Sequence, residues 1–215
     1  MKWINKMKST NKIWLILIAL VASSLAVSCG IVGGTTTVKI GLLSPQTGPI
    51  ANYAPGFEDA ANIAISELNE GQDDYVFELI VADSGCDGTQ AATSAQALID
   101  SGVAGIVGAA CSGATLGAIA VAAPAGVPMV SYASTSPAIS SAADDGYLFR
   151  VVPSDAQRSV ALVDVVKAGS SNPAVLYMTN DYGAGLGENF KEAWGGLCAE
   201  VGYDPTEGSY DASTL

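Results

Sequence analysis

Residues 101–132 read SGVAGIVGAACSGATLGAIAVAAPAGVPMVSY and carry the pattern that decides the fold. An apolar run at 102–107 is followed by a helix-compatible segment at 112–123 and by a second apolar run at 127–132. Short, nearly continuous apolar runs on either side of a helix are typical of strand–helix–strand units in parallel sheets. We therefore expect a buried parallel sheet in this part of the chain.

The same alternation continues in both directions along the sequence. We expect further strands at 38–43, 76–82, 147–152 and 174–179, and further helices at 55–69, 88–100, 155–168 and 183–200. Helices that alternate with apolar strands indicate a parallel sheet covered on both faces. The predicted fold class is α/β, with a doubly wound parallel sheet.

The first 30 residues have the features of an export signal. Four lysines precede the apolar run at 13–27, which is shorter than the roughly 20 residues that a membrane span needs. The end of the run, LAVSC at 25–29, resembles a bacterial lipoprotein signal. We expect a signal peptide at 1–28, lipidation of Cys29, a tether at 29–36, and an exported protein in the periplasm or at the cell surface, anchored to the membrane through its lipid.

Charge limits the partners of the exported chain. The formal net charge is −12, and loss of residues 1–28 would leave five basic residues against 21 acidic ones, a net charge of −16. Such a surface repels nucleic acid and anionic lipid. We expect no nucleic-acid partner and no membrane contact beyond the lipid anchor.

Composition also excludes several kinds of chemistry. The chain has no histidine, so it contains no Cys-His pair, Ser-His-Asp triad or His-containing metal site. Its four cysteines show no C-x-x-C spacing, which argues against a zinc cluster. We expect no metal, no cofactor and no catalysis. Cys111, just after the apolar run at 102–107, is then half of a disulfide, which an oxidising compartment permits, or a small core residue.

Hydroxyl-rich segments follow three of the predicted strands, where open parallel sheets bind their ligands. These segments are SPQTGPIANYAPG at 44–56, ACSGAT at 110–115 and YASTSPA at 132–138. Helix N-termini offer unpaired N–H groups that suit a carboxylate or a phosphate. The alternative is that Ser112 and Ser136 are ordinary N-caps. We favour a binding site at this edge of the sheet.

The glycine string GAGLG at 183–187 is similar to a dinucleotide-binding loop, but only weakly. Its third glycine comes one position early, and we expect no strand with an acidic end after the helix that it opens. A nucleotide site is therefore disfavoured.

Several longer segments resemble one known family. They are KIGLLSPQTGPIANYAPGFEDAANIAISELNEG, VADSGCDGTQAATSAQALI, ACSGAT, VSYASTSPA and NDYGAGLGENF. They are similar to the periplasmic leucine/isoleucine/valine-binding proteins, the type I solute receptors of branched-chain amino acid ABC transporters. The resemblance implies two α/β lobes joined by a hinge, with 37–152 as the first lobe. Residues 153–215 would begin a second lobe whose remainder the sequence lacks.

The resemblance also implies a disulfide and a set of ligand contacts. The disulfide falls on Cys86 and Cys111. The ligand-binding residues that it implies are Tyr53, Ser112, Ala133, Ser134, Thr135 and Tyr182. Ser112 and Thr135 would hold the ligand's α-carboxylate, the carbonyl of Ala133 and the hydroxyl of Thr135 its α-ammonium, and the two tyrosines its side chain. In the family a carboxylate beyond Leu215 completes the ammonium site.

The function implied is binding without chemistry. We expect a monomeric receptor that takes a branched-chain or other aliphatic amino acid to the permease subunits of an ABC importer. One alternative is a receptor of the same fold for an amide, a urea-like compound or an aromatic acid, in transport or sensing. An exported enzyme is the least favoured function, because the sequence offers no identifiable nucleophile–base pair.

Overall fold

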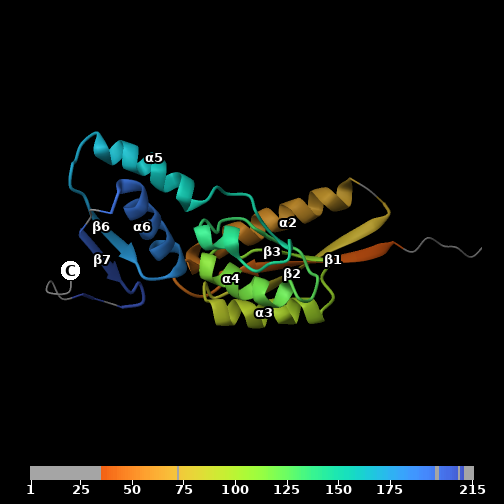
Figure 1. Ribbon diagram of the computed structural model, residues 1–215. Coiled ribbons are helices and arrows are strands. Elements are labelled where there is room, and N and C mark those ends of the chain that lie inside the picture. Colours follow the sequence, from red (N-terminus) through yellow and green to blue (C-terminus); the bar gives the residue numbers. More distant parts are fainter. Residues whose placement is uncertain (1–34, 72, 197–198, 208, 211–215) are drawn as a thin grey trace, which may run out of the picture. The chain divides into compact units, whose positions relative to one another are not determined.

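The computed structural model contains two sheets among the residues that it describes, one of five strands and one of two (Figure 1). The described residues are 35–71, 73–196, 199–207 and 209–210. The predicted signal peptide, Cys29, Cys198 and most of the predicted tether lie outside them. Within these ranges, no helix combines the length and the apolar character needed to cross a membrane.

The larger sheet has the strand order β2-β1-β3-β4-β5. Its strands are β1 (Thr36–Ser44), β2 (Tyr75–Asp83), β3 (Gly105–Val107), β4 (Met129–Ser131) and β5 (Leu148–Arg150). The pairs β1–β3, β3–β4 and β4–β5 are parallel. Because β2 and β3 lie on opposite sides of β1, the strand order reverses at β1, and ligands of doubly wound sheets bind next to such a reversal. The α/β prediction is confirmed.

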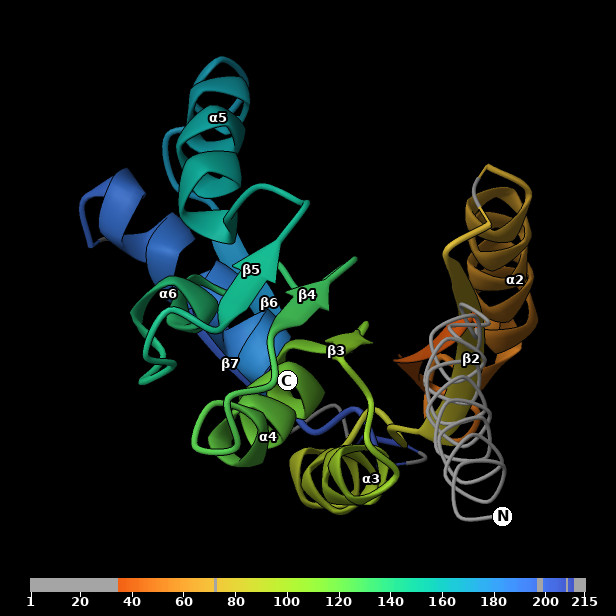
Figure 2. The ribbon, with the colours of Figure 1, turned by 90° about the vertical axis from the view of Figure 1, so that its right-hand side faces the viewer.

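Helices α3 and α4 lie side by side and cover one face of this sheet (Figure 2). The helices before β5 are α2 (Ala54–Glu70), α3 (Gly88–Asp100), α4 (Ser112–Ala122) and the short 3-10 helices η2 (Ala51–Tyr53) and η3 (Pro137–Ser141). Alanines from α3 and α4 dominate the buried cluster, and they let both helices approach Leu43, Ile106 and Met129 of the sheet closely. Helix α2 packs against β2.

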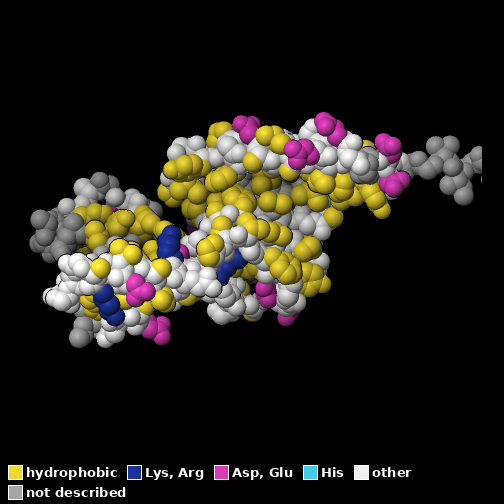
Figure 3. All heavy atoms as spheres, turned by 90° about the horizontal axis from the view of Figure 1, so that it is seen from above, with side chains coloured by type: hydrophobic (Ala, Val, Ile, Leu, Met, Phe, Trp, Pro, Cys, Tyr) yellow, Lys and Arg dark blue, Asp and Glu magenta, His cyan; other side chains and the backbone are white. Residues whose placement is uncertain are grey.

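Both faces of the sheet are covered at β1 but not at β4 and β5. Leu42 and Leu43 point to opposite faces and are 1% and 0% exposed. Val130 and Phe149, which are paired across β4 and β5, are 37% and 57% exposed. The expectation of a sheet covered on both faces is therefore wrong at this end, among the residues that the structure describes. Exposed apolar side chains are visible over much of the face that Figure 3 shows.

The smaller sheet pairs β6 (Ala174–Met178) with β7 (Ala199–Tyr203) in parallel. Helix α6 (Asp181–Trp194) connects the two strands, and α5 (Asp155–Lys167) packs against α6. The prediction of one helix over 183–200 without a following strand is wrong, because Gly195 and Gly196 adopt positive φ angles of 104° and 84° and end the helix.

The glycines of the string at 183–187 lie inside α6, which begins at Asp181. They do not form a loop before the helix, as the phosphate-binding turn of a dinucleotide site does. The arrangement therefore gives no support to a nucleotide site, even though a strand does follow this helix.

Candidate binding site at the start of helices α3, α4 and α6

A cavity of about 550 Å³ lies beside the N-termini of α3, α4 and α6. Its walls are Pro49, Ile50, Cys86, Asp87, Gly88, Ala110, Cys111, Ser112, Gly113, Ala133, Thr135, Arg158, Met178, Asn180, Asp181 and Tyr182. The segments after β1, β2, β3 and β4 all contribute to it. This is the edge of the sheet at which the sequence predicts a site.

Four of the six predicted ligand-binding residues line this cavity: Ser112, Ala133, Thr135 and Tyr182. The other two do not. Tyr53 is 59% exposed, with its ring 6.5 Å from that of Phe57. Ser134 is buried, and its side chain bonds to groups of the protein interior.

Ser112 is the first residue of α4, where backbone N–H groups lack partners within the helix. Its hydroxyl accepts a hydrogen bond from the Ser136 N–H over 3.2 Å. Ser136 is an N-cap, as the alternative expects, because its hydroxyl accepts from the N–H of Ala138 at the start of η3. The helix N-terminus gives this end of the cavity the character of a hydrogen-bond donor.

A disulfide joins Cys86 to Cys111, the pairing that the family resemblance implies. Their Cα atoms are 5.2 Å apart, although strands β2 and β3 lie on opposite sides of β1. Cys86 reaches across because it lies three residues beyond Asp83, the last residue of β2. The bond fastens together two of the loops that line the cavity. Of the two alternatives for Cys111, a disulfide or a small core residue, the disulfide is confirmed.

A buried cluster of hydroxyls holds the loop after β3 against the loop after β4. The Oγ atom of Ser134 lies 2.8 Å from Thr115 Oγ1, and its N–H donates to Ser131 Oγ over 3.0 Å. Ser131 Oγ in turn donates to the carbonyl of Ala109 over 2.7 Å. The three hydroxyl residues are at most 1% exposed. Ser134 therefore fixes the position of its neighbour Thr135, but does not itself line the cavity.

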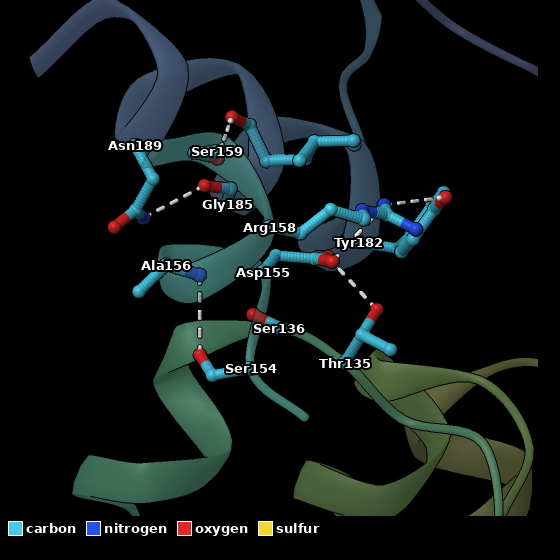
Figure 4. Close-up of polar contacts among 12 residues, drawn as sticks. Thr135, Ser136, Ser154, Asp155, Ala156, Arg158, Ser159, Tyr182, Gly185 and Asn189 are labelled. Atoms are coloured by element: carbon cyan, nitrogen blue, oxygen red, sulfur yellow. Dashed lines mark hydrogen bonds and ion pairs between the residues drawn. The ribbon is translucent and has the colours of Figure 1, made fainter. Parts of the chain in front are cut away.

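Thr135 is paired with Asp155, the first residue of α5 (Figure 4). Thr135 Oγ1 donates to Asp155 Oδ2 over 2.8 Å, and the Asp155 N–H donates to the Thr135 carbonyl over 2.8 Å. Asp155 is fully buried. Its Oδ1 lies 3.0 Å from Arg158 Nη2 as an ion pair, but accepts no hydrogen bond of good geometry from the described residues. The pair places a buried carboxylate behind a hydroxyl of the cavity wall.

Arg158 and Tyr182 form the wall contributed by α5 and α6. Arg158 Nη2 donates to the Tyr182 hydroxyl over 3.0 Å, and its guanidinium carbon lies 5.7 Å from the centre of the tyrosine ring (Figure 4). These contacts hold the ring in place. The guanidinium is shared between Asp155 and Tyr182, so it is already engaged within the protein.

Asp155 and Arg158 were not predicted as site residues. The Ser154–Asp155 pair reads as the start of a helix, and Ser154 does cap α5 by accepting a hydrogen bond from the Ala156 N–H. Asp155 acquires its second role from contact with Thr135, 20 residues earlier. A carboxylate next to the cavity wall is thus present before Leu215, besides the one that the family resemblance places beyond Leu215.

The cavity lining carries both hydrogen-bond donors and acceptors. Donors lie at the start of α4, the Ala133 carbonyl and the Thr135 hydroxyl provide acceptors, and the carboxylates of Asp87 and Asp181 also lie on the lining. Such an arrangement suits a small molecule that carries an anionic and a cationic group. In the described ranges, no three His, Cys, Asp or Glu side chains are grouped to hold a metal ion.

A second cavity, of about 390 Å³, lies between α5, α6 and the smaller sheet. Its walls are almost entirely apolar, and Tyr182 is the one predicted ligand-binding residue among them. It lacks the α4 N-terminus and the Thr135 hydroxyl of the first cavity.

Comparisons with known proteins by sequence and by structure agree on one family. A family model described as Periplasmic binding protein matches residues 37–213. A relative from Pseudomonas aeruginosa, named leucine-, isoleucine-, valine-, threonine-, and alanine-binding protein, is 30% identical over 162 residues, which are 73% of this chain and 43% of the relative. The chain spans about half the length of the curated relatives that it matches.

Two solved structures are similar to this chain. The branched-chain amino acid transporter substrate-binding protein LivJ of Streptococcus pneumoniae, in complex with isoleucine, is 27% identical with a TM-score of 0.73, over 83% of this chain and 53% of that one. A solute-binding protein of an ABC transporter from Rhodopseudomonas palustris, in complex with 3,4-dihydroxybenzoic acid, is 27% identical with a TM-score of 0.67, over 78% of this chain and 47% of that one.

Proposed function

The chain belongs to the periplasmic binding protein family, and we propose that it is a receptor that binds an amino acid and delivers it to an ABC importer. A branched-chain or other aliphatic amino acid is the ligand that we favour. The relatives named for leucine, isoleucine and valine, and the similar structure that holds isoleucine, support this choice.

One observation carries the proposal: a single cavity is lined by the N-terminus of α4 and by the Ala133 carbonyl and Thr135 hydroxyl. The α-carboxylate of the ligand would lie at the N-terminus of α4, with Ser112 as a further donor. The α-ammonium would lie against the Ala133 carbonyl and the Thr135 hydroxyl. That hydroxyl gives its proton to Asp155, so its lone pairs are directed to the ligand, and the buried carboxylate behind it adds attraction for a cation.

Apolar side chains at the remaining wall fit an aliphatic ligand. Ile50, Pro49 and Met178 lie on the lining together with the ring of Tyr182. Burial of a leucine-sized side chain contributes about 1.5–3 kcal/mol, so such a wall adds substantially to affinity. Tyr53 lies outside this lining and has no place in the proposed ligand contacts.

The remaining features of the receptor are part of the same proposal. Residues 37–152 and 153–215 would belong to two lobes, and the protein would act as a monomer without chemistry of its own. Export and lipidation of Cys29 would hold it at the membrane beside the permease. Mass spectrometry of the exported protein tests the anchor, because the proposed form begins with an acylated Cys29.

Titration calorimetry with matched ligands tests the proposed function. Leucine is compared with 4-methylpentanoate, which lacks the ammonium, and with 3-methylbutylamine, which lacks the carboxylate. We expect leucine, isoleucine or valine to bind and both truncated compounds to bind at least about 100-fold more weakly, because each leaves part of the proposed polar contacts without a partner. Equal binding of leucine and 4-methylpentanoate contradicts the proposal.

An aromatic acid is the second candidate ligand. The similar protein from Rhodopseudomonas palustris holds 3,4-dihydroxybenzoic acid, and Arg158 offers a cation on the lining here. Asp155 and Tyr182 already engage that guanidinium, which disfavours this candidate. The same titration decides between the two when 3,4-dihydroxybenzoate is included.

A further inference from the structure

Gly185, in the first half of α6, faces η3 with no room for a side chain. A methyl group at this position would lie 3.0 Å from Ser136 Oγ and 3.1 Å from Pro137 Cδ. Carbon contacts in proteins are ordinarily longer than this, so either η3 or α6 would have to move. Gly185 and Ser136 are both labelled in Figure 4, where they come from different elements.

The start of η3, which Gly185 faces, is held in place by several contacts. The Ser136 N–H donates to Ser112 Oγ, and the Ser136 carbonyl accepts from Arg150 Nη1 over 2.8 Å. Ser136 itself is 1% exposed. Since these bonds hold the start of η3, a larger residue at 185 would displace α6 instead.

A second glycine makes a similar contact at the start of α4. A methyl group at Gly113 would come within 2.5 Å of Asp181 Oδ2, at the first residue of α6. Both η3 and α4 follow strands of the larger sheet. Each of them contacts α6, beside the smaller sheet, at a position where one of the two elements has a glycine.

Glycine is disfavoured at interior positions of helices, where alanine is the best residue. Gly185 therefore opposes the local helical propensity where α6 meets η3, and Gly113, the second residue of α4, lies where α4 meets α6. The close approach explains their presence, because helix formation alone would favour alanine.

We propose that Gly185, assisted by Gly113 opposite Asp181, determines how closely α6 approaches η3 and α4, and thereby how tightly the cavity encloses its ligand. The statement about the ligand rests on the proposed function. Gly185 does not belong to the cavity lining, so a side chain there changes affinity through the position of α6 and not through contact with the ligand. Gly185 is accordingly a positioning residue.

The first experiment compares Gly185→Ala and Gly185→Leu with Gly56→Ala and Gly56→Leu. Gly56 lies in α2, with no atom within 4 Å of the position that a methyl group would take, and is a matched helical control. Two quantities are measured: the affinity for leucine by calorimetry, and the amide hydrogen exchange of residues 137–141 without ligand. All four variants should fold, because each replaces a helical glycine by a better helix former.

We expect Gly185→Leu to weaken leucine binding at least about 10-fold and to speed exchange at 137–141, with Gly185→Ala intermediate and the Gly56 variants unchanged. Wild-type affinity and wild-type exchange in Gly185→Leu would overturn the proposal. If the wild-type protein binds none of the tested amino acids, the proposed function fails, and the exchange at 137–141 still decides whether Gly185 sets the approach of α6.

A double-mutant cycle tests Gly113. Gly113→Ala should weaken leucine binding in the wild-type background, and the loss should disappear in the Asp181→Ala background, where the opposing carboxylate is gone. Equal losses in both backgrounds would show that Gly113 does not act through its contact with Asp181.

Discussion

The hydroxyl of Thr135 donates to the carboxylate of Asp155 over 2.8 Å, while the Asp155 N–H donates back to the Thr135 carbonyl over 2.8 Å. These reciprocal bonds join the loop after β4 to the first turn of α5. Because Thr135 lines the cavity and Asp155 lies behind it, Asp155 sets the geometry that Thr135 presents to a ligand.

Replacement of Thr135 by valine tests this pair with little change in side-chain shape. The variant removes both the acceptor for the ligand's ammonium and the donor to Asp155. Hydrogen bonds to charged groups contribute about 1.5–3 kcal/mol, so leucine affinity should fall about 10- to 100-fold in calorimetry. Thr93→Val is the control, since Thr93 donates only to the Thr89 carbonyl within α3. Equal affinities of the two variants would remove Thr135 from the site.

Removal of the Cys86–Cys111 disulfide should lower stability through the unfolded state. The two cysteines are separated by 25 residues, and closure of a loop of that length contributes roughly 3 kcal/mol in the chain-entropy model. Urea unfolding of a Cys86→Ala/Cys111→Ala variant measures the loss.

Reducing agent provides the control for this experiment. It should destabilise the wild-type protein by a similar amount and leave the double variant unaffected. If reduction does not change the unfolding of the wild-type protein, the bond makes no contribution to stability.

Asp83 should make the free energy of unfolding depend on pH in the acidic range. Burial acts to raise its pKa, but hydrogen bonds from Thr47, Gly85 and Gln90 outweigh burial and hold the pKa below its usual value. A lowered pKa in the folded state means that the carboxylate stabilises the fold above its unfolded pKa of about 4, and that this contribution disappears as pH falls through the folded value.

An Asp83→Asn variant measures this contribution. We expect it to be less stable than wild type by about 1–2 kcal/mol at pH 7, because the side chain is partly exposed and its bonds are shared with water. The difference in unfolding free energy should shrink below about pH 4. A difference that is the same at pH 3 and pH 7 contradicts the assignment.

Substitution of Tyr132 tests how the loop after β4 is held against β1. Its hydroxyl donates to the Leu43 carbonyl over 3.1 Å, and its ring centre lies 4.8 Å from that of Phe57. Burial, with a smaller contribution from Glu58, raises the pKa of this phenol. Tyr132→Phe keeps the ring contact and should lower the unfolding free energy by about 1 kcal/mol. A change of several kcal/mol would mean that the hydroxyl has further partners.

Most of the fold was predictable because its local patterns agree with its tertiary structure. Helix α3 begins and ends where its apolar spacing predicts, at Gly88 and Asp100. Strand β7 was not predicted, because the helical pattern of α6 runs on in sequence past Gly195 and the short strand has few apolar residues. The coverage of β4 and β5 depends on packing partners far away in sequence, which periodicity does not record.

The site was predictable to the level of its loops, but not to the level of each side chain. The carboxyl ends of parallel strands meet at one edge, and this geometry brings Ser112 and Thr135 together. Whether Ser134 faces the cavity or the interior depends on Thr115 and Ser131, which only the folded chain places beside it. The contact between Thr135 and Asp155 arises in the same way.

The buried hydroxyl cluster around Ser134 has a consequence for how ligand preference can change during evolution. It joins the loops that carry Ser112 and Thr135, and Ile50 and Met178 of the lining take no part in it. In the proposed receptor, recognition of the part common to all amino acids is thereby separated from selection of the side chain. In such a receptor, mutations at Ile50 or Met178 would redirect the protein to a new amino acid while leaving the shared anchor undisturbed.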